Sequence, residues 1–427
     1  MSQLPPHRAF WVIATTFVMV LFTSSAPSPL YPVYQQLWGF SSFTLTCVFA
    51  IYVATMLTSL LSVGSLSDHI GRRPVLAIAL VLLAVSMVLF LVADGVGTLM
   101  AARALQGLAT GAAMGTLAAT VIDMAPDARL GSAISGAAPA IGLAGGVLVA
   151  GILVEYAPAP RFLIFEIALG GFAVLLVALL IVPETSHRVG FTSRGHILAT
   201  LAPRVTVPAA VRRTYWQATP GFVATWSLGG LYLSLGSSVV ATVFGVTNHA
   251  AAGLVLFTFF AAAAATSLLI TGRGSDAKLA YGYPALAGGV LISLAGVLTE
   301  TLPLYLAGSV IAGSGFAATF LGGLDKVSDA APAPQRGEVF SAVFIVSYVA
   351  FSVPAVVAGL IVSHAGLQPT TVGYVIYVLV ATLVGAALML RGRRAEKLST
   401  TSYSGVTPHI DETGEYEEGH APEIQFK

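Results

Sequence analysis

The chain has 427 residues, of which 56% are hydrophobic and only 9% are charged, against roughly 25% charged residues in soluble domains. A soluble fold with this balance could not cover its surface with polar groups, so the composition excludes that class and indicates a polytopic membrane protein. The net charge of +1 gives no bulk attraction to nucleic acid, and a single cysteine, Cys47, provides neither a disulfide framework nor a cysteine-based zinc site.

Twelve long apolar segments follow one another along the chain, and a helix needs about 20 apolar residues to cross the hydrocarbon. Helices are the expected spanning structure, because the bilayer offers no water to backbone groups and the sequence shows no short alternating barrel pattern. The first segment is interpreted as a retained span rather than a signal peptide, because it is too long and carries Trp11. We therefore predict spans over 9–29, 44–66, 74–93, 98–122, 131–154, 162–182, 217–243, 250–271, 281–299, 303–324, 338–362 and 370–390.

Positive charge separates between the two sets of gaps and predicts the orientation. One set, with the two ends of the chain, carries nearly all Lys and Arg residues, whereas the opposite set holds only Arg161. The positive-inside rule then places both termini in the cytoplasm of a multi-pass protein of the cytoplasmic membrane. The excess of Arg over Lys, with abundant Ala and Gly, is typical of a bacterium with a GC-rich genome.

Two segments are not membranous and divide the chain. Residues 183–215 form a basic, Pro-containing cytoplasmic linker between six spans and six spans, and residues 399–427 form an acidic tail that we expect to be disordered. The predicted domains are therefore an N-terminal six-helix bundle over 1–182, the linker, a C-terminal six-helix bundle over 216–398 and the tail.

The two six-span halves share one register. Shifting the second half back by 208 positions aligns residues at matching topological places, which indicates parallel repeats about an axis along the membrane normal. Transporters built in this way place the substrate between the halves, near the midplane. The aligned pairs include Gly64 with Gly272, Asp68 with Asp276, Gly107 with Gly315, Pro126 with Pro334 and Gly151 with Gly359.

The sharpest motif joins the second and third spans. Gly64 allows close helix approach, and Gly71 permits the tight turn that reverses the chain. Arg72 and Arg73 anchor the loop on the cytoplasmic side.

An acidic residue farther along belongs with this motif. Asp123 stands at the cytoplasmic end of the fourth span, where a helix C-terminus disfavours negative charge and calls for a cation. We predict that Asp68, Arg72 and Asp123 form a charge cluster that holds the two halves together at the inner face; the alternative is a topology anchor alone.

The loop from Gly64 to Arg73 resembles the signature Gly-x-x-x-Asp-Arg-x-Gly-Arg-Arg of the major facilitator superfamily, with His69 in place of the first Arg. The second half contains a degenerate copy of this motif at Gly272–Lys278. The segment Arg103-Ala-Leu-Gln-Gly107 is similar to the second signature of that family. The resemblance implies an all-α membrane protein with twelve transmembrane helices in two pseudo-symmetric six-helix bundles. Within the family, the chain resembles bacterial drug:proton antiporter-type members with twelve spans.

Two charged residues inside predicted spans are candidates for coupling. A charge within a span is expensive and normally faces a polar interior. In relatives, the Arg that matches Arg103 is implicated in proton coupling or substrate binding, and Gln106 lies one turn away on the same face. Arg103 lies close enough to the outer boundary to snorkel to water instead. Glu166 is the default proton carrier, although its span is a supporting helix in this superfamily.

The fifth span is rich in small residues and bendable, as expected of a helix at a moving interface. Exporters of the superfamily carry Gly-Pro-x-x-Gly-Gly here, whereas this chain has Gly142, Gly145 and Gly146 with its proline at Pro139. This worn signature leaves the direction of transport open. At the outer end of the first span, three prolines from Pro27 to Pro32 predict a rigid loop.

The resemblance places the cavity among spans one, four, seven and ten, with help from two, five, eight and eleven. Few charges and many aromatics there suit an apolar or weakly polar substrate. Besides Arg103, the pocket candidates are Tyr52, Gln106, Trp226, Tyr232, Phe316, Phe320 and Tyr348.

The predicted function is secondary active transport by alternating access, with proton-coupled export of small amphipathic molecules; a proton-coupled importer of a small metabolite is the alternative. An integral-membrane enzyme is disfavoured, because no metal-ligand cluster, nucleophile constellation or phosphate loop is present. A channel or sensor would not explain the repeat. The expected partners are a small-molecule substrate, protons and the lipid bilayer, with no metal or cofactor, in a monomer.

Overall fold

The computed structural model describes residues 4–63, 66–186, 202–203 and 205–403, without the side chains of Asp68 and 393–403. Every regular element in these ranges is a helix. The described residues form two compact units that divide between Ala386 and Ala387. Gly64, most of the predicted linker and most of the predicted tail lie outside the described ranges.

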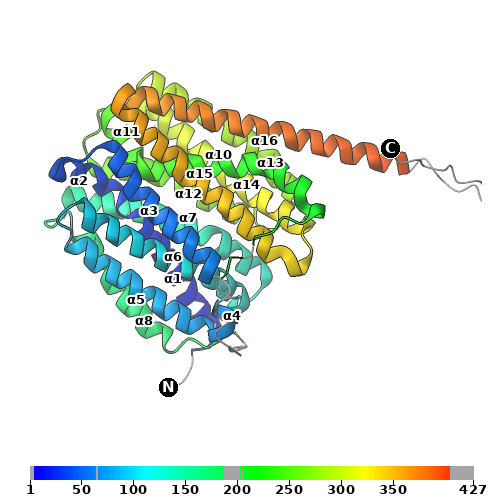
Figure 1. Cartoon of the computed structure of the whole chain (residues 1–427), viewed down its shortest axis with the longest axis horizontal. Helices are drawn as coiled ribbons and strands as arrows, with labels where there is room; N and C mark the ends of the chain where they lie inside the picture. The colour runs from blue at the N-terminus through cyan, green and yellow to red at the C-terminus, as the bar shows by residue number, and fades with distance from the viewer. Residues whose placement is uncertain (1–3, 64–65, 187–201, 204, 404–427) are drawn as a thin grey trace, which may run out of the picture. The chain divides into compact units, whose positions relative to one another are not determined.

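The first six-span half is drawn in blue to green in Figure 1. Its elements are α1 (Pro6–Ser25), the 3-10 helix η1 (Ser28–Leu30), α2 (Tyr31–Trp38), α3 (Ser42–Val63), α4 (Leu66–Ile70), α5 (Arg72–Leu91), α6 (Val96–Met124), α7 (Ala128–Tyr156) and α8 (Leu163–Leu179).

The second half follows in green to orange. Its elements are α10 (Ala209–Ser234), α11 (Gly236–Val243), α12 (His249–Leu269), α13 (Ser275–Leu298), α14 (Leu302–Ala330), the 3-10 helix η2 (Ala333–Gln335), α15 (Arg336–Ala365) and α16 (Leu367–Tyr403).

Each of the twelve predicted spans coincides with a helix, but not all are equally long. Within the described residues, ten helices are long and apolar enough to cross a membrane, and α10 with α11, bent by 64°, makes an eleventh. The sixth predicted span corresponds to α8, which has 17 residues and, at 1.5 Å per residue, reaches roughly 25 Å. Helices such as α10 and α16 also run past their apolar windows, since good helix formers continue there; α16 reaches Tyr403, beyond the predicted start of the tail.

The proline-rich turn after α1 differs from the rigid loop that the sequence predicts. The helix does end at Ser25, but the chain then forms η1 and the two-turn helix α2, which Gly39 terminates at a φ of 64°. Pro29 and Pro32 are the second residues of these two elements, in the first turn, where a missing N–H leaves no intrahelical bond unmade.

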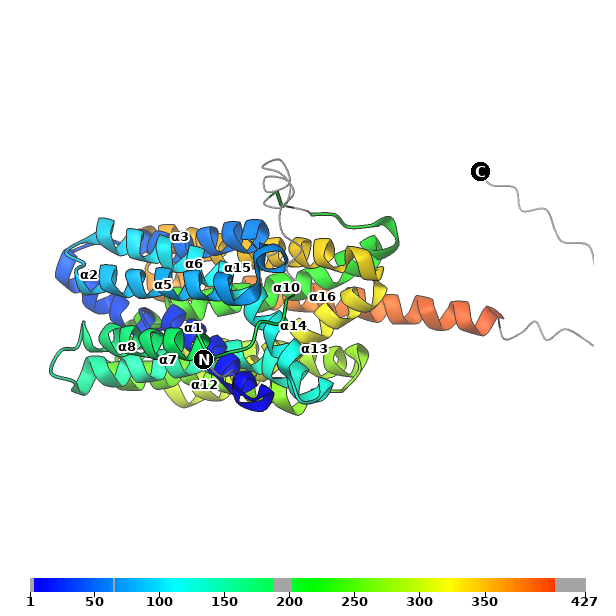
Figure 2. The ribbon, with the colours of Figure 1, turned by 90° about the horizontal axis from the view of Figure 1, so that it is seen from below.

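Close helix contacts relate the two halves as a twofold repeat requires. A Cβ on Gly151 of α7 would lie 2.6 Å from the carbonyl oxygen of His249, at the start of α12. A Cβ on Gly359 of α15 would lie 2.9 Å from the carbonyl oxygen of Ser42, at the start of α3. Gly151 and Gly359 are one of the aligned pairs, so equivalent residues make equivalent contacts on opposite sides of the interface. Figure 2 shows α7 and α12 side by side.

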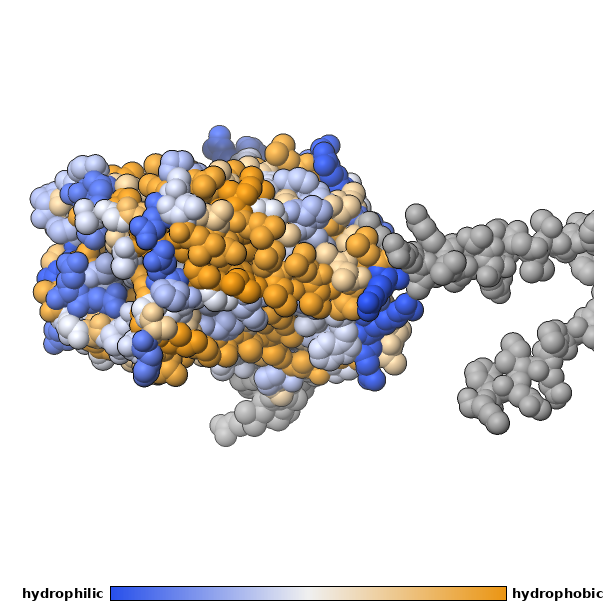
Figure 3. Space-filling view, turned by 90° about the horizontal axis from the view of Figure 1, so that it is seen from above, coloured by the Kyte–Doolittle hydropathy of each residue, from blue (hydrophilic) through white to orange (hydrophobic). Residues whose placement is uncertain are grey.

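The visible surface of the first unit is apolar across its middle and polar toward its two ends (Figure 3). Val174 and Val177 of α8 and Leu269 of α12, for example, are 68%, 66% and 75% exposed. Exposed apolar faces of this extent mark contact with a membrane. We call the end predicted to face the cytoplasm the inner end and the opposite end the outer end.

Candidate functional site

Arg103 is the only charged side chain among the buried residues that the structure describes, with 0% exposure. It lies about two turns inside α6 and hydrogen-bonds only neutral oxygens. Nε donates to the Tyr31 hydroxyl at 2.9 Å, and Nη2 donates to the same oxygen. Nη1 donates to the Ser24 carbonyl at 3.0 Å and to Gln106 Oε1 at 2.6 Å. The guanidinium therefore does not snorkel to water.

The end of α1 supplies the acceptors for this site. Gln106 Nε2 donates to the Thr23 carbonyl at 2.8 Å. In a continuing helix, that carbonyl would accept the N–H of residue 27, which is a proline and has none. Pro27 thus leaves the Thr23 carbonyl available. The C-terminal end of α1 also points its partial negative charge at Arg103.

Two glycines bring α6 against α3. A Cβ on Gly107 would overlap the Tyr52 carbonyl oxygen, and one on Gly111 would overlap the Met56 carbonyl oxygen. The close approach places Cζ of Arg103 5.0 Å from the centroid of the Tyr52 ring and 5.5 Å from that of Tyr31. The structure thus brings Arg103, Gln106 and Tyr52 together and adds Tyr31, which lies in the turn that the sequence treats as a loop.

Trp226 of α10 lies at the centre of an aromatic cluster, which we call the Trp226 cluster. Its ring centroid is 6.4 Å from Phe316, 5.4 Å from Phe320, 5.0 Å from Tyr348 and 5.3 Å from Phe351. Phe351 is absent from the predicted set but stands three residues after Tyr348, and the helical period puts both on one face.

Two polar atoms of this cluster are buried without a hydrogen-bond partner among the described residues. They are Nε1 of Trp226 and the hydroxyl of Tyr348. A buried polar group normally finds a partner, so each is a free hydrogen-bonding position.

Tyr232 belongs to a different group. Its ring stacks on Phe259 at 4.3 Å and Tyr305 at 6.1 Å, and its hydroxyl hydrogen-bonds Ser309 at 2.5 Å. These contacts hold α10 against α12 and α14, and Phe259 links them to the Trp226 cluster through Phe316, whose ring centroid lies 5.5 Å away.

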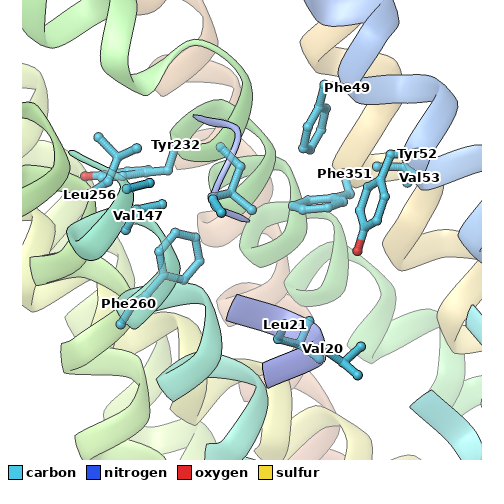
Figure 4. Close-up of a cluster of buried hydrophobic side chains, with 14 of the residues drawn as sticks. Val20, Leu21, Phe49, Tyr52, Val53, Val147, Tyr232, Leu256, Phe260 and Phe351 are labelled. Carbon is cyan, nitrogen blue, oxygen red and sulfur yellow. The ribbon is translucent and has the colours of Figure 1, made fainter. Parts of the chain in front are cut away.

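The arginine site and the Trp226 cluster meet across the two halves. Phe49 of α3 packs edge-on against Phe351 of α15 at 5.0 Å. Figure 4 shows Phe351 lying beside Phe49 and Tyr52. Tyr52 therefore contacts Arg103 on one side and faces the second half on the other.

Glu166 lies apart from this site. It occupies the first turn of α8, with an exposed side chain. Its role as proton carrier stays a prediction.

At the inner end, Arg72 and Arg73 begin α5 and join three helices of the first half. Arg72 pairs with Asp123 at the end of α6, and Arg73 Nη2 donates to the Leu180 carbonyl at 2.6 Å, after α8. The chain turns into α5 at Gly71, whose φ is 103°, a region that glycine enters without penalty.

Glu184 completes this inner cluster and was not anticipated from the sequence. Its carboxylate accepts the backbone N–H groups of Arg72 at 2.9 Å and Arg73 at 3.2 Å, which caps the N-terminus of α5. The Pro183-Glu184 step directly after the sixth span was the available signal. These contacts of Arg72, Arg73 and Asp123 all lie within the first half, whereas the cluster was predicted to join the halves. Gly64 and the side chain of Asp68 lie outside the described residues.

The second half carries a counterpart of this pairing. Lys278 Nζ lies 2.5 Å from Asp325 Oδ2, and Lys326 Nζ lies 2.9 Å from Asp276 Oδ1. These pairs join the start of α13 to the end of α14, as Arg72 and Asp123 join α5 to α6.

The two halves also meet at the outer end. The backbone N–H of His249, which begins α12, donates to Glu155 Oε2 at 2.8 Å. The Ser28 hydroxyl donates to the Leu233 carbonyl at 2.8 Å. A Cβ on Gly253 would lie 2.6 Å from the Val147 carbonyl oxygen, so α7 and α12 are in backbone contact.

The Major Facilitator Superfamily family model matches residues 13–355. An MFS-type transporter named EfpA, from Mycobacterium tuberculosis (strain H37Rv), is 28% identical over 296 residues, 68% of this chain and 52% of its own length. The putative multidrug resistance protein MdtD of Salmonella typhi is 23% identical over 256 residues, 59% of this chain and 53% of its own. The chain spans about half the length of these curated relatives.

Solved structures support the same fold. A bacterial homologue of the human lysosomal transporter Spinster, in an inward-facing and unoccupied conformation, matches with a TM-score of 0.71 and 14% identity. The match covers 90% of this chain and 96% of that one. The human organic anion transporter MFSD10 matches with a TM-score of 0.62, 20% identity and 90% and 100% coverage. The chain therefore belongs to the Major Facilitator Superfamily, a family of membrane transporters rather than enzymes, and is a multi-pass membrane protein with two pseudo-symmetric helical bundles.

Proposed function

We propose that this protein is a secondary transporter that exports small amphipathic organic molecules in exchange for protons by alternating access. The observation that carries the proposal is the group of largely buried side chains formed by Arg103, Tyr52 and the Trp226 cluster, at which the two bundles meet. A substrate held there is in reach of the inner end when the bundles separate on that side.

The seams between the halves fit a rocking motion. The contacts at Gly151 and Gly359 are backbone-close, small and equivalent in the repeat. Helices with small contact residues can pivot with little rearrangement of side chains. The inner cluster of Arg72, Asp123 and Glu184 fastens α5, α6 and the end of α8 together, so that the first half moves as one body.

Export is favoured over import by two features. Gly142 and Gly146 of α7 bring the Val18 and Phe22 carbonyls of α1 into contact, so the small residues of the fifth span pack against a cavity helix. The relative MdtD is named as a multidrug resistance protein. Coupling to protons rests on the likeness of Arg103 and Gln106 to the second family signature.

Proteoliposomes that hold a pH-sensitive dye in the lumen test this function. A pH gradient is imposed so that the lumen is acidic. With the inner face of the protein outward, addition of an exported substrate should release lumenal protons and accumulate the substrate. In this orientation a proton-coupled importer would instead carry substrate preloaded in the lumen outward together with lumenal protons, and added substrate would not accumulate. If no compound of a broad amphipathic panel changes the lumenal pH or accumulates in the lumen, proton-coupled transport is contradicted.

A further inference from the structure

We propose that the transported molecule is an aromatic organic anion, whose negative group is drawn to Arg103 and whose ring packs in the Trp226 cluster. The assignment rests on the proposed function and names the class of substrate for the same site. It follows from the charges, the unpartnered donors and the rings that the two halves bring together.

The first argument is charge. Arg103 is the one charged side chain that is buried in the described part of the chain, and its four hydrogen bonds go to a phenol, a carbonyl and an amide. Acidic side chains described in the spans stand at helix ends, as Asp123 does, or outward, as Glu166 does. Burying a cation is costly unless an anion pairs with it. The partial charge at the end of α1, about half an elementary charge, offsets only part of this.

The second argument is the hydrogen-bonding sense of the Trp226 cluster. Trp226 Nε1 can only donate, and the Tyr348 hydroxyl is free to donate. Both would be satisfied by acceptor oxygens on a ligand. A carboxylate offers acceptors only, whereas an ammonium offers donors only.

The third argument is the shape of the apolar surface. Trp226, Phe316, Phe320, Tyr348 and Phe351 present rings from three helices. Aromatic rings pack favourably against another flat ring. Such a surface also attracts cations, but a cation here would meet the field of Arg103, with no buried carboxylate among the described residues to offset it.

Three probes with one bicyclic body separate the charge classes: 2-naphthoate, neutral 2-naphthamide and 2-naphthylmethylammonium. Binding to the full-length protein in detergent is measured by equilibrium dialysis, with protein-free micelles as the partition blank. We expect 2-naphthoate to bind at least about tenfold more tightly than the ammonium, as one charge-assisted hydrogen bond provides. Tightest binding of the ammonium, or no binding of any probe, would overturn the proposal.

Variants locate the effect. Arg103→Gln should weaken 2-naphthoate about tenfold and change 2-naphthamide less than about twofold, because the loss of the positive charge penalises only the anion. Arg103→Lys keeps the positive charge and should retain the preference for the anion. This variant tests the role of the charge if the Gln variant does not fold. Trp226→Phe keeps the ring and removes the donor, so both oxygen-bearing probes should weaken; Trp216→Phe, on the exposed side of the same helix, is the matched control. Equal weakening of all three probes in Arg103→Gln would assign Arg103 a purely structural role and refute the proposal.

A transport assay distinguishes the assignment of the ligand class from the proposed transporter function. In proteoliposomes, 2-naphthoate should accumulate against its gradient. Tight, Arg103-dependent binding without transport would reject the transporter function and leave the assignment of ligand class standing. Transport of the ammonium but not of 2-naphthoate would support the transporter function and reject the assignment of an anionic substrate.

Discussion

At the residue scale, the site is built on a carbonyl that one proline leaves free. The Thr23 carbonyl lacks the usual donor four residues on, because Pro27 has no N–H. The Nε2 group of Gln106 donates to this carbonyl instead, while Oε1 of the same side chain accepts from Arg103. One amide side chain therefore satisfies both the end of α1 and the buried guanidinium. This accounts physically for a Gln three residues after the Arg in this signature.

Gln106→Leu tests that role. The change keeps the volume but leaves the Thr23 carbonyl and one Arg103 N–H unpaired in the interior. We expect the free energy of unfolding to fall by about 1 to 3 kcal/mol. Thermal unfolding of the purified protein measures it, with Gln36→Leu, on the exposed side of α2, as the control. An unchanged melting temperature would contradict the network.

Glu184 provides a second test at this scale. Glu184→Gln removes the negative charge at the N-terminus of α5 but keeps the shape. We expect a loss of about 1 kcal/mol in stability, with slower transport because α5 and the end of α8 come apart. Asp329 is an exposed carboxylate at the inner end, and Asp329→Asn should leave both the stability and the transport rate unchanged. Equal melting temperatures for the Glu184 variant and wild type would rule out the cap.

At the scale of elements, glycine decides which helix faces touch. Gly107 and Gly111 set α6 against α3, Gly142 and Gly146 set α7 against α1, and Gly151 sets α7 against α12. The first two contacts lie within one half and the last lies between halves. The same residue type therefore packs helices within a bundle in one place and between the two halves in another.

Gly151→Ala should act on the seam. Its added Cβ would lie 2.6 Å from the His249 carbonyl oxygen, which is backbone and cannot turn away, so the outer ends should be forced apart. We expect faster thiol labelling of a cysteine introduced at Ser28, which sits under the outer contact, in a Cys47→Ser background. Gly170→Ala, where the Cβ would meet nothing within 4 Å, is the control. Identical labelling rates in the two variants would show that the seam does not control access.

At the scale of the whole molecule, polar contacts at Ser28 and Glu155 join the two halves at the outer end, and the inner charge pairs stay within each half. Apolar contacts between the halves continue toward the inner end, where a Cβ on Gly136 of α7 would lie 3.8 Å from Leu321 of α14. The fold is shared with a structure described as inward-facing.

A cross-link tests whether this closure must be released during transport. Thr46→Cys with Gly359→Cys, in a Cys47→Ser background, would join α3 to α15 where a Cβ on Gly359 lies 2.8 Å from Thr46 Cγ2. Oxidation should abolish transport, and reductant should restore it. Ala125→Cys with Gly131→Cys, joined within the first half, should transport in both redox states. Continued transport by the oxidised Thr46–Gly359 pair would exclude rocking about this seam.

Much of the architecture was readable in advance because its causes are local. The apolar windows depend on residues near one another in sequence, and the helices found match them. The η1–α2 turn was missed because three prolines in six residues read as a loop, although two of them sit where helices tolerate proline.

The sequence by itself determined that the chain spans a membrane in two related halves and that Arg103 is an unusual charge, because hydropathy and motif spacing are properties of short segments. Only the tertiary structure decided that Arg103 is fully buried among neutral acceptors, that Phe351 and Trp226 face Tyr52 across the halves, and that Glu184 caps α5. Those facts depend on how closely helices distant in sequence approach, and packing of side chains at glycine contacts sets that distance.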